Sequence, residues 1–183
     1  MTALTELLHF DRQTQALGQV SGRLGWDQET MMPSGSSAQR GEEMAALEGV
    51  LHARRSDPRV GDWLAACDGQ AFDRVTQAQL REIKTAYERA VKVPGDLAEA
   101  IASTTSMAQG KWAAARAEDD FAAFAPVLQE VLALKREEGQ ALAAGGDVYD
   151  AMLADYEPGT TASELDQMFG ALRPGLVALR GEI

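Results

Sequence analysis

The sequence predicts an all-α protein, with about seven helices in an irregular helical bundle. The composition favours helix, because Ala, Leu, Glu, Gln and Arg dominate and runs of β-branched residues are absent. Apolar residues recur at three- and four-residue steps, and no segment alternates in the manner of a strand. A length of 183 residues suits one domain. We therefore expect residues 1–183 to form a single helical domain.

The N-terminal part predicts two helices separated by a loop. Apolar residues from Thr2 to Gly22 lie on one face of a helix, which we expect Gly22 and Gly25 to end. Residues 24–36 contain a tryptophan, a proline and several serines, a composition typical of an irregular loop followed by a helix N-cap. The second helix then covers residues 37–55.

The middle of the chain predicts three helices, over residues 58–68, 73–93 and 96–118. Asp57 and Pro58 form a start signal, because aspartate caps the first N–H groups and proline fits the first helical position. Pro94 and Gly95 end the second of these helices. The third has a polar stretch of serines and threonines in its middle.

A long helix and a short helix are predicted next. The long helix begins at Asp119 or Asp120 and fades before Gly145. Pro126 lies inside its apolar pattern, so it either kinks this helix or marks its true start. The short helix covers residues 147–156.

The final helix, over residues 162–180, is predicted by a capping box formed by Thr161 and Glu164. Six apolar side chains form one stripe along it: Leu165, Met168, Phe169, Leu172, Leu176 and Leu179. An exposed stripe of this breadth favours self-association. We therefore expect a homo-oligomer that is built partly on this helix.

The charge of the chain argues against two classes of partner. A net charge of −11 and a pI of about 4.6 repel phosphate backbones and anionic lipids, so we expect neither nucleic acid nor membrane as a partner. No segment is apolar enough to span a bilayer, and residues 1–20 lack a signal-peptide pattern. The lone Cys67 cannot form an internal disulfide, which is typical of a reducing compartment. We expect a cytoplasmic protein.

The two histidines, His9 and His52, form no recognisable metal or catalytic motif. A His-Glu-x-x-His zinc site needs a glutamate after the first histidine, and neither histidine here has one. A di-iron bundle needs two Glu-x-x-His pairs; Glu6 and His9 fit, but Glu48 and His52 are four residues apart. Neither histidine has a motif that would activate a Ser, Cys or Thr nucleophile. We predict no catalytic residue, no metal ligand and no cofactor in this chain.

Several acidic residues have both a structural and a chemical interpretation. Asp120 and Asp147 fall where helix N-caps are expected. Paired carboxylates can act in acid–base catalysis when burial separates their pKa values. For Asp27, Asp155 and Glu157 we favour buried hydrogen bonds that hold the local geometry over contact with a substrate.

The tryptophans Trp26 and Trp112 also have either a structural or a functional interpretation. Trp112 lies on a clean helical stripe, so we expect it in the core. Trp26 lies in the predicted loop, where packing demands are weaker and functional roles are more common.

Three blocks of sequence follow one another along the chain. The first is Leu-Gly-Trp-Asp-Gln-Glu-Thr-Met-Met-Pro at residues 24–33, with Gly35 and Arg40 after it. A weaker block combines Trp112 with Asp-Asp-Phe at residues 119–121. The third, residues 147–159, ends with Asp-Tyr-Glu-Pro-Gly. In this order the blocks resemble the N-terminal part of the carboxypeptidase Taq family, the thermostable zinc metallocarboxypeptidases.

The resemblance implies an all-helical enzyme that depends on zinc or cobalt. It also implies the layout of a homodimer. Such enzymes remove C-terminal amino acids from peptides in a deep cleft that the N-terminal helices wall. Zinc or cobalt and a peptide substrate are therefore expected only in a full-length relative. The chain departs from the family pattern at Thr160 and at residues 41–43, Gly-Glu-Glu, and these departures affect no catalytic residue.

Nine residues of the first and third blocks are candidates for the substrate cleft or for structural roles: Trp26, Asp27, Glu29, Arg40, Tyr149, Asp150, Asp155, Tyr156 and Glu157. We expect the two tyrosines to pack inward. Two functions stay open. The chain is either the N-terminal helical part of a zinc-dependent metallocarboxypeptidase, inactive alone, or a non-catalytic helical interaction or dimerisation module derived from that family.

Overall fold

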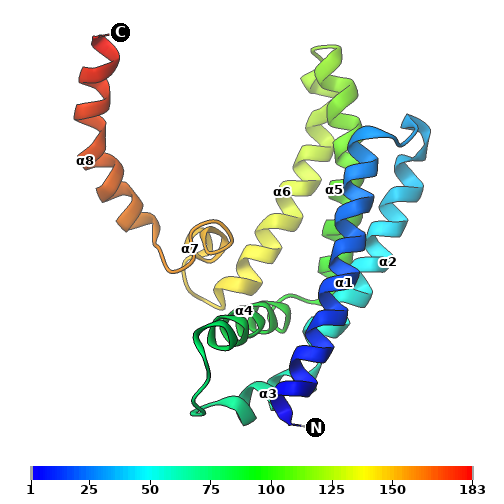
Figure 1. Cartoon of the computed structure of the whole chain (residues 1–183). Coiled ribbons are helices and arrows are strands. Elements are labelled where there is room, and N and C mark those ends of the chain that lie inside the picture. The colour runs from blue at the N-terminus through cyan, green and yellow to red at the C-terminus, as the bar shows by residue number, and fades with distance from the viewer. Residues whose placement is uncertain (1, 183) are drawn as a thin grey trace. The chain divides into compact units, whose positions relative to one another are not determined.

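The computed structural model describes residues 2–182, which form eight α-helices and one 3₁₀ turn and contain no β-strand (Figure 1). The elements are α1 (Ala3–Thr30), η1 (Ser34–Ser36), α2 (Ser37–Arg55), α3 (Pro58–Cys67), α4 (Arg74–Ala90), α5 (Gly95–Ala117), α6 (Phe121–Ala143), α7 (Val148–Leu153) and α8 (Ala162–Gly181). The all-α prediction is confirmed. No helix in the described part of the chain is long and apolar enough to cross a membrane.

The chain divides into two compact units, and the boundary lies after Lys135, inside α6. The first unit contains α1 to α5 and the start of α6, and the second contains the end of α6 with α7 and α8. The single domain expected from the chain length stays a prediction.

Helix α1 is longer than the sequence predicts, because it continues through Gly22 and Gly25 to Thr30. The loop expected at residues 24–36 is therefore wrong in its first half. Each helical glycine costs about 1 kcal/mol relative to alanine. Packing against α2 and α3, with hydrogen bonds from the last turns of α1 to α2 and α5, offsets this cost. The chain leaves the helix only just before Pro33.

The first unit is held together by two kinds of packing. Helices α2 and α5 run side by side over most of their length (Figure 1). Small residues bring them close, since a Cβ on Gly41 would lie 3.0 Å from Met107 Cγ and one on Gly110 would lie 2.9 Å from the Ser37 hydroxyl. Near the start of α1, an apolar cluster joins α1, α3 and α4 through Leu7, Val60 and Ile83.

Helix starts in the first unit follow the sequence closely. Asp57 accepts a hydrogen bond from the Arg59 backbone N–H at 2.9 Å, and Pro58 occupies the first turn of α3. Asp73 caps α4 by accepting the Val75 N–H at 2.9 Å. Asp120 accepts the Ala123 N–H at 3.0 Å, so α6 begins where the aspartate pair predicts. The predicted caps at Asp57 and Asp120 are confirmed, and Asp73 is a further cap that the structure adds.

The Asp73 cap makes the stability of the fold depend on pH. Hydrogen bonds from the side chain and backbone of Thr76 lower the pKa of Asp73 below its ordinary value. A lowered folded-state pKa contributes stability that is present above the unfolded pKa and lost as pH falls through the folded pKa. We expect Asp73→Ala to lower the melting temperature at neutral pH, and the difference from wild type to shrink in acid. Thermal melts from neutral pH to below the pKa of free aspartate measure this, with the exposed Asp62→Ala as control; a difference that does not change with pH would contradict the assignment.

In the second unit, α6 and α7 approach each other closely at Gly139. A Cβ on Gly139 of α6 would lie 2.8 Å from Val148 Cγ1 of α7, so only glycine allows this approach. Asp147 caps α7 by accepting the Asp150 N–H at 3.0 Å, as predicted. Helix α6 starts ahead of Pro126, which therefore lies inside the helix and does not mark its start.

Helix α8 begins with the predicted capping box of Thr161 and Glu164. Its apolar stripe faces solvent. Exposure is 47% for Met168, 57% for Phe169 and 61% for Leu176, values that rule out a covered stripe in this structure. Within the second unit, α7 is the element that contacts α8.

Candidate functional site

The first sequence block folds as the end of α1 and the start of α2, so its polar residues lie between helices. Asp27 and Glu29 are on the last turns of α1, and Arg40 is near the start of α2. Because neighbouring positions on a helix point in different directions, Asp27 reaches α2 whereas Glu29 reaches α5. The block therefore joins three helices of the first unit.

Arg40 is the most constrained of these residues. Its side chain is buried, with 8% exposure, and it donates from Nη2 to Asp27 Oδ2 at 2.5 Å and from Nε to Glu43 Oε2 at 2.9 Å. Its Nη1 donates to the carbonyl oxygen of Leu24. The hydrogen bond to Asp27 is the main reason that the pKa of Arg40 is raised above its ordinary value. We call this group of four residues the Arg40 clamp.

The Arg40 clamp holds α1 against α2 and does not offer a free cation. Every nitrogen of the guanidinium donates to a partner within the protein. A substrate carboxylate would have to displace Asp27 or Glu43 before it could pair with Arg40. Glu43, one of the residues at which we expect a departure from the family pattern, supplies the second carboxylate. The clamp is thus a structural element.

A second set of hydrogen bonds joins α1 to α5. The Gln28 amide donates to the Ser106 carbonyl oxygen at 2.7 Å and accepts from the Ser106 hydroxyl at 2.9 Å. Glu29 accepts from the Gln109 amide at 2.8 Å. Neither Gln28 nor Gln109 was predicted as a functional residue, and the polar stretch in the middle of α5 is the only sequence signal for this contact.

Two tryptophans lie where the sequence did not place them. Trp26 is on helix α1, not in a loop, and is 63% exposed. Trp112 is 50% exposed, so its predicted place in the core is wrong. Helix α2 covers the apolar stripe of α5 only along its own length. Gly110 of α5 lies opposite Ser37, which is the first residue of α2, so the cover ends there. Trp112 lies beyond that point, where helical periodicity continues but the covering helix does not.

The third sequence block is mostly on the surface. Tyr149 is 65% exposed and Tyr156 is 82% exposed, so the prediction that both pack inward is wrong. Helix α7 turns Val148 toward Gly139 of α6, which leaves the neighbouring Tyr149 on an outer face. Asp155 and Glu157 are exposed as well, so the burial expected for these two residues is wrong.

Asp150 of this block positions the start of α8. Its Oδ1 accepts the backbone N–H of Ala162 at 2.7 Å. Ala162 is the first residue of α8, so this bond satisfies one of the N–H groups that a helix start leaves unpaired. Asp150 therefore fixes where α8 begins relative to α7, within the second unit.

The candidate residues do not assemble into a centre that could hold a metal. Residues 2–182 contain no group of three His, Cys, Asp or Glu side chains suited to a metal ion. The two histidines are engaged separately: His9 contacts the Gln13 amide at 3.3 Å, and His52 Nε2 lies 2.7 Å from the Val93 carbonyl oxygen. The candidate residues that have partners form hydrogen bonds at helix junctions.

The fold is all-α, and the polar residues of the first block form hydrogen bonds between helices. These features are those of a helical class of proteins. Comparison with known families identifies that class. The model of the carboxypeptidase Taq (M32) metallopeptidase family matches residues 6–183. The chain therefore belongs to the carboxypeptidase Taq family, and it corresponds to the N-terminal part of that family.

Individual relatives agree with this assignment. The chain is 39% identical over 194 aligned residues to thermostable carboxypeptidase 1 of Thermus thermophilus, and the match covers 99% of this chain and 38% of that protein. The solved structure of Trypanosoma cruzi metallocarboxypeptidase 1 superimposes with a TM-score of 0.73 at 32% identity, over 94% of this chain and 35% of that one. Pyrococcus furiosus carboxypeptidase gives a TM-score of 0.77 at 26% identity, over 98% and 36%. The chain thus spans well under half the length of these relatives.

Proposed function

We propose that these 183 residues are the N-terminal helical part of a zinc-dependent metallocarboxypeptidase that releases C-terminal amino acids from peptides. In this proposal the chain contributes a wall of the substrate cleft, and zinc or cobalt is bound by residues outside it. The family match over residues 6–183 supports the proposal. The lone cysteine, Cys67, is buried, which accords with the cytoplasmic location that we include in it.

One structural observation carries the assigned role. The charged residues of the first block are joined to each other and to α5 across helix junctions, and Arg40 has no nitrogen without a partner. Residues arranged in this way position helices and do not move protons on a substrate. The reacting groups of the proposed enzyme therefore belong to the remainder of a full-length protein.

The first test is metal content and peptidase activity of the isolated chain. We expect no stoichiometric zinc after dialysis and no release of C-terminal residues in added zinc or cobalt, because the sequence has no His-Glu-x-x-His segment. Full-length Thermus thermophilus thermostable carboxypeptidase 1 serves as the positive control. One tightly held metal per chain together with activity would overturn the assignment of the chemistry to residues outside this chain.

The coding sequence beyond Ile183 tests the role in the parent protein. An in-frame His-Glu-x-x-His segment downstream would support the enzyme, because it would supply two metal ligands and the catalytic glutamate together. A stop codon directly after Ile183 would instead favour the second candidate function.

That second candidate is a non-catalytic helical interaction or dimerisation module derived from the family. It is favoured by the exposed apolar stripe on α8, where an open surface cavity is lined by Phe169, Leu172, Leu176 and Val177 together with Arg173 and Arg180. Exposed apolar surface of this kind marks an interface more often than a free surface. In a full-length relative the same stripe would be available to the rest of the chain.

Both candidate functions predict that the isolated chain self-associates through α8. We expect light scattering to report a dimer or larger species that dissociates on dilution, since a hydrophobic contact between identical chains depends on concentration. Phe169→Glu should shift the protein to monomer, because it places a charge in the exposed stripe. Gln167→Glu, which adds the same charge at another exposed position of α8, is the matched control and should leave association unchanged. A monomer for the wild-type chain at every concentration would rule out this interface.

A further inference from the structure

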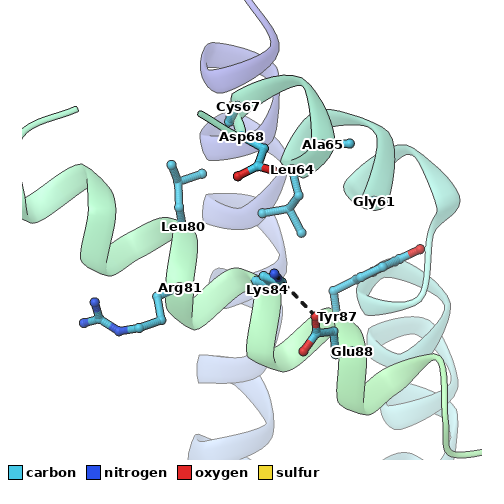
Figure 2. A pocket seen from close by; sticks show the side chains of 10 residues that line it. All are labelled: Gly61, Leu64, Ala65, Cys67, Asp68, Leu80, Arg81, Lys84, Tyr87 and Glu88. Atoms are coloured by element: carbon cyan, nitrogen blue, oxygen red, sulfur yellow. Dashed lines mark ion pairs between the residues drawn. The ribbon is translucent and has the colours of Figure 1, made fainter. Parts of the chain in front are cut away.

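The space between α3 and α4 forms a pocket that belongs to none of the three sequence blocks (Figure 2). It has a volume of about 440 Å³, within the range of small-molecule sites. Leu64 of α3 and Leu80 of α4 supply apolar walls, and the ring of Tyr87 extends from α4 toward Gly61 of α3 (Figure 2). All of these residues lie in the first unit.

Gly61 shapes one end of this pocket. A Cβ at this position would lie 2.6 Å from the Tyr87 hydroxyl oxygen, so any larger residue would push the tyrosine away. The glycine therefore allows the tyrosine ring to pack beneath α3. This contact joins residues from two different helices, so no local sequence pattern predicts it.

Both signs of charge line the pocket, because Arg81, Lys84 and Glu88 lie on its α4 wall and Asp68 lies beside α3. Asp68 follows the end of α3, and its carboxylate points toward Leu64, whereas Lys84 lies on α4 (Figure 2). The ammonium of Lys84 is 3.8 Å from Glu88 Oε1, which is longer than a hydrogen bond, and its side chain is 64% exposed. This loose ion pair leaves the ammonium able to receive another anion.

We propose that the pocket between α3 and α4 binds a free apolar α-amino acid in its zwitterionic form. The carboxylate pairs with Lys84, the ammonium group pairs with Asp68, and the side chain lies between Leu64 and Leu80. This ligand class matches the opposite charges of Lys84 and Asp68 and the apolar space beside them, whereas a simple fatty acid would leave Asp68 unmatched. The proposal does not depend on peptidase activity.

The test uses the whole chain and L-leucine as the probe, followed by amide and methyl NMR shifts. We expect saturable shifts at the two leucines of the pocket walls and at Lys84. N-acetyl-leucine and leucinamide each lack one charge and should bind roughly tenfold more weakly, the change expected for loss of one charged hydrogen bond. Glycine, which keeps both charges but has no side chain to bury, should bind more weakly as well.

Two variants test the assigned partners. Lys84→Met and Asp68→Asn should each weaken L-leucine binding roughly tenfold, while the exposed Lys111→Met on α5 should leave it unchanged. Circular dichroism of each variant establishes that the helices are intact. Absence of saturable shifts for L-leucine would overturn the proposal. Equal binding of leucine and N-acetyl-leucine, or unchanged binding in both pocket variants, would overturn it too, because the pocket would then select only apolar surface.

Discussion

Leu7→Ala is expected to lower the free energy of unfolding by about 2–5 kcal/mol, the range for emptying a buried leucine site. Leu7 has no exposed surface and contacts Val60 and Ile83 in the cluster that joins α1, α3 and α4. The lost methyl groups leave a cavity, because three helices cannot all move inward to fill it. Urea denaturation followed by circular dichroism gives the change.

The matched control for Leu7→Ala is Val75→Ala on α4. Val75 is 68% exposed, so this variant should change the free energy of unfolding by no more than about 0.5 kcal/mol. If both variants unfold at the same urea concentration, the cluster of α1, α3 and α4 is not the stabilising core of the first unit.

Arg40→Ala is expected to lower the free energy of unfolding by about 2–3 kcal/mol. Removing one partner of a fully buried ion pair costs about 3–5 kcal/mol, because the other charge is left without a partner. Here the side chains of Asp27 and Glu43 are 41% and 38% exposed, so water can solvate them and the free energy of unfolding falls by less. Denaturation curves with circular dichroism detection measure it.

Two further variants separate the clamp from a general charge effect. Arg40→Lys keeps the charge but loses the planar fork that reaches three acceptors, so its loss of stability should be intermediate. Arg116→Ala removes an arginine that is 71% exposed and pairs with Asp119 at 3.5 Å, and it should change stability by less than about 1 kcal/mol. Equal effects for Arg40→Ala and Arg116→Ala would show that the clamp does not hold α1 against α2.

The helix starts of this protein could be predicted because their causes lie within a few residues. Asp73 and Asp120 each accept an N–H from the first turn of the helix they precede. Thr161 and Glu164 satisfy each other's backbone in the capping box. Such local hydrogen bonds depend on residue type and spacing, so the sequence contains all the information they need.

The candidate site could be predicted only in part. Arg40, Asp27 and Glu29 were recognised from the first block, but their partners on α2 and α5 were not all identifiable. Glu29 pairs with Gln109, which is far away in sequence and lies outside every block. The apolar period of α5 also continues through Trp112, although that residue is 50% exposed.

The sequence by itself determined the helical class, the capped starts of α3, α4, α6, α7 and α8, and the apolar stripe on α8, because each depends on local spacing and composition. Tertiary structure alone decided the length of α1, the exposure of Trp112 and Tyr156, and the pocket between α3 and α4. In each of these cases the outcome depends on whether another helix supplies contacts at that position. A glycine such as Gly25 stays helical when neighbouring helices offset its cost, and an aromatic side chain stays exposed when no helix reaches it.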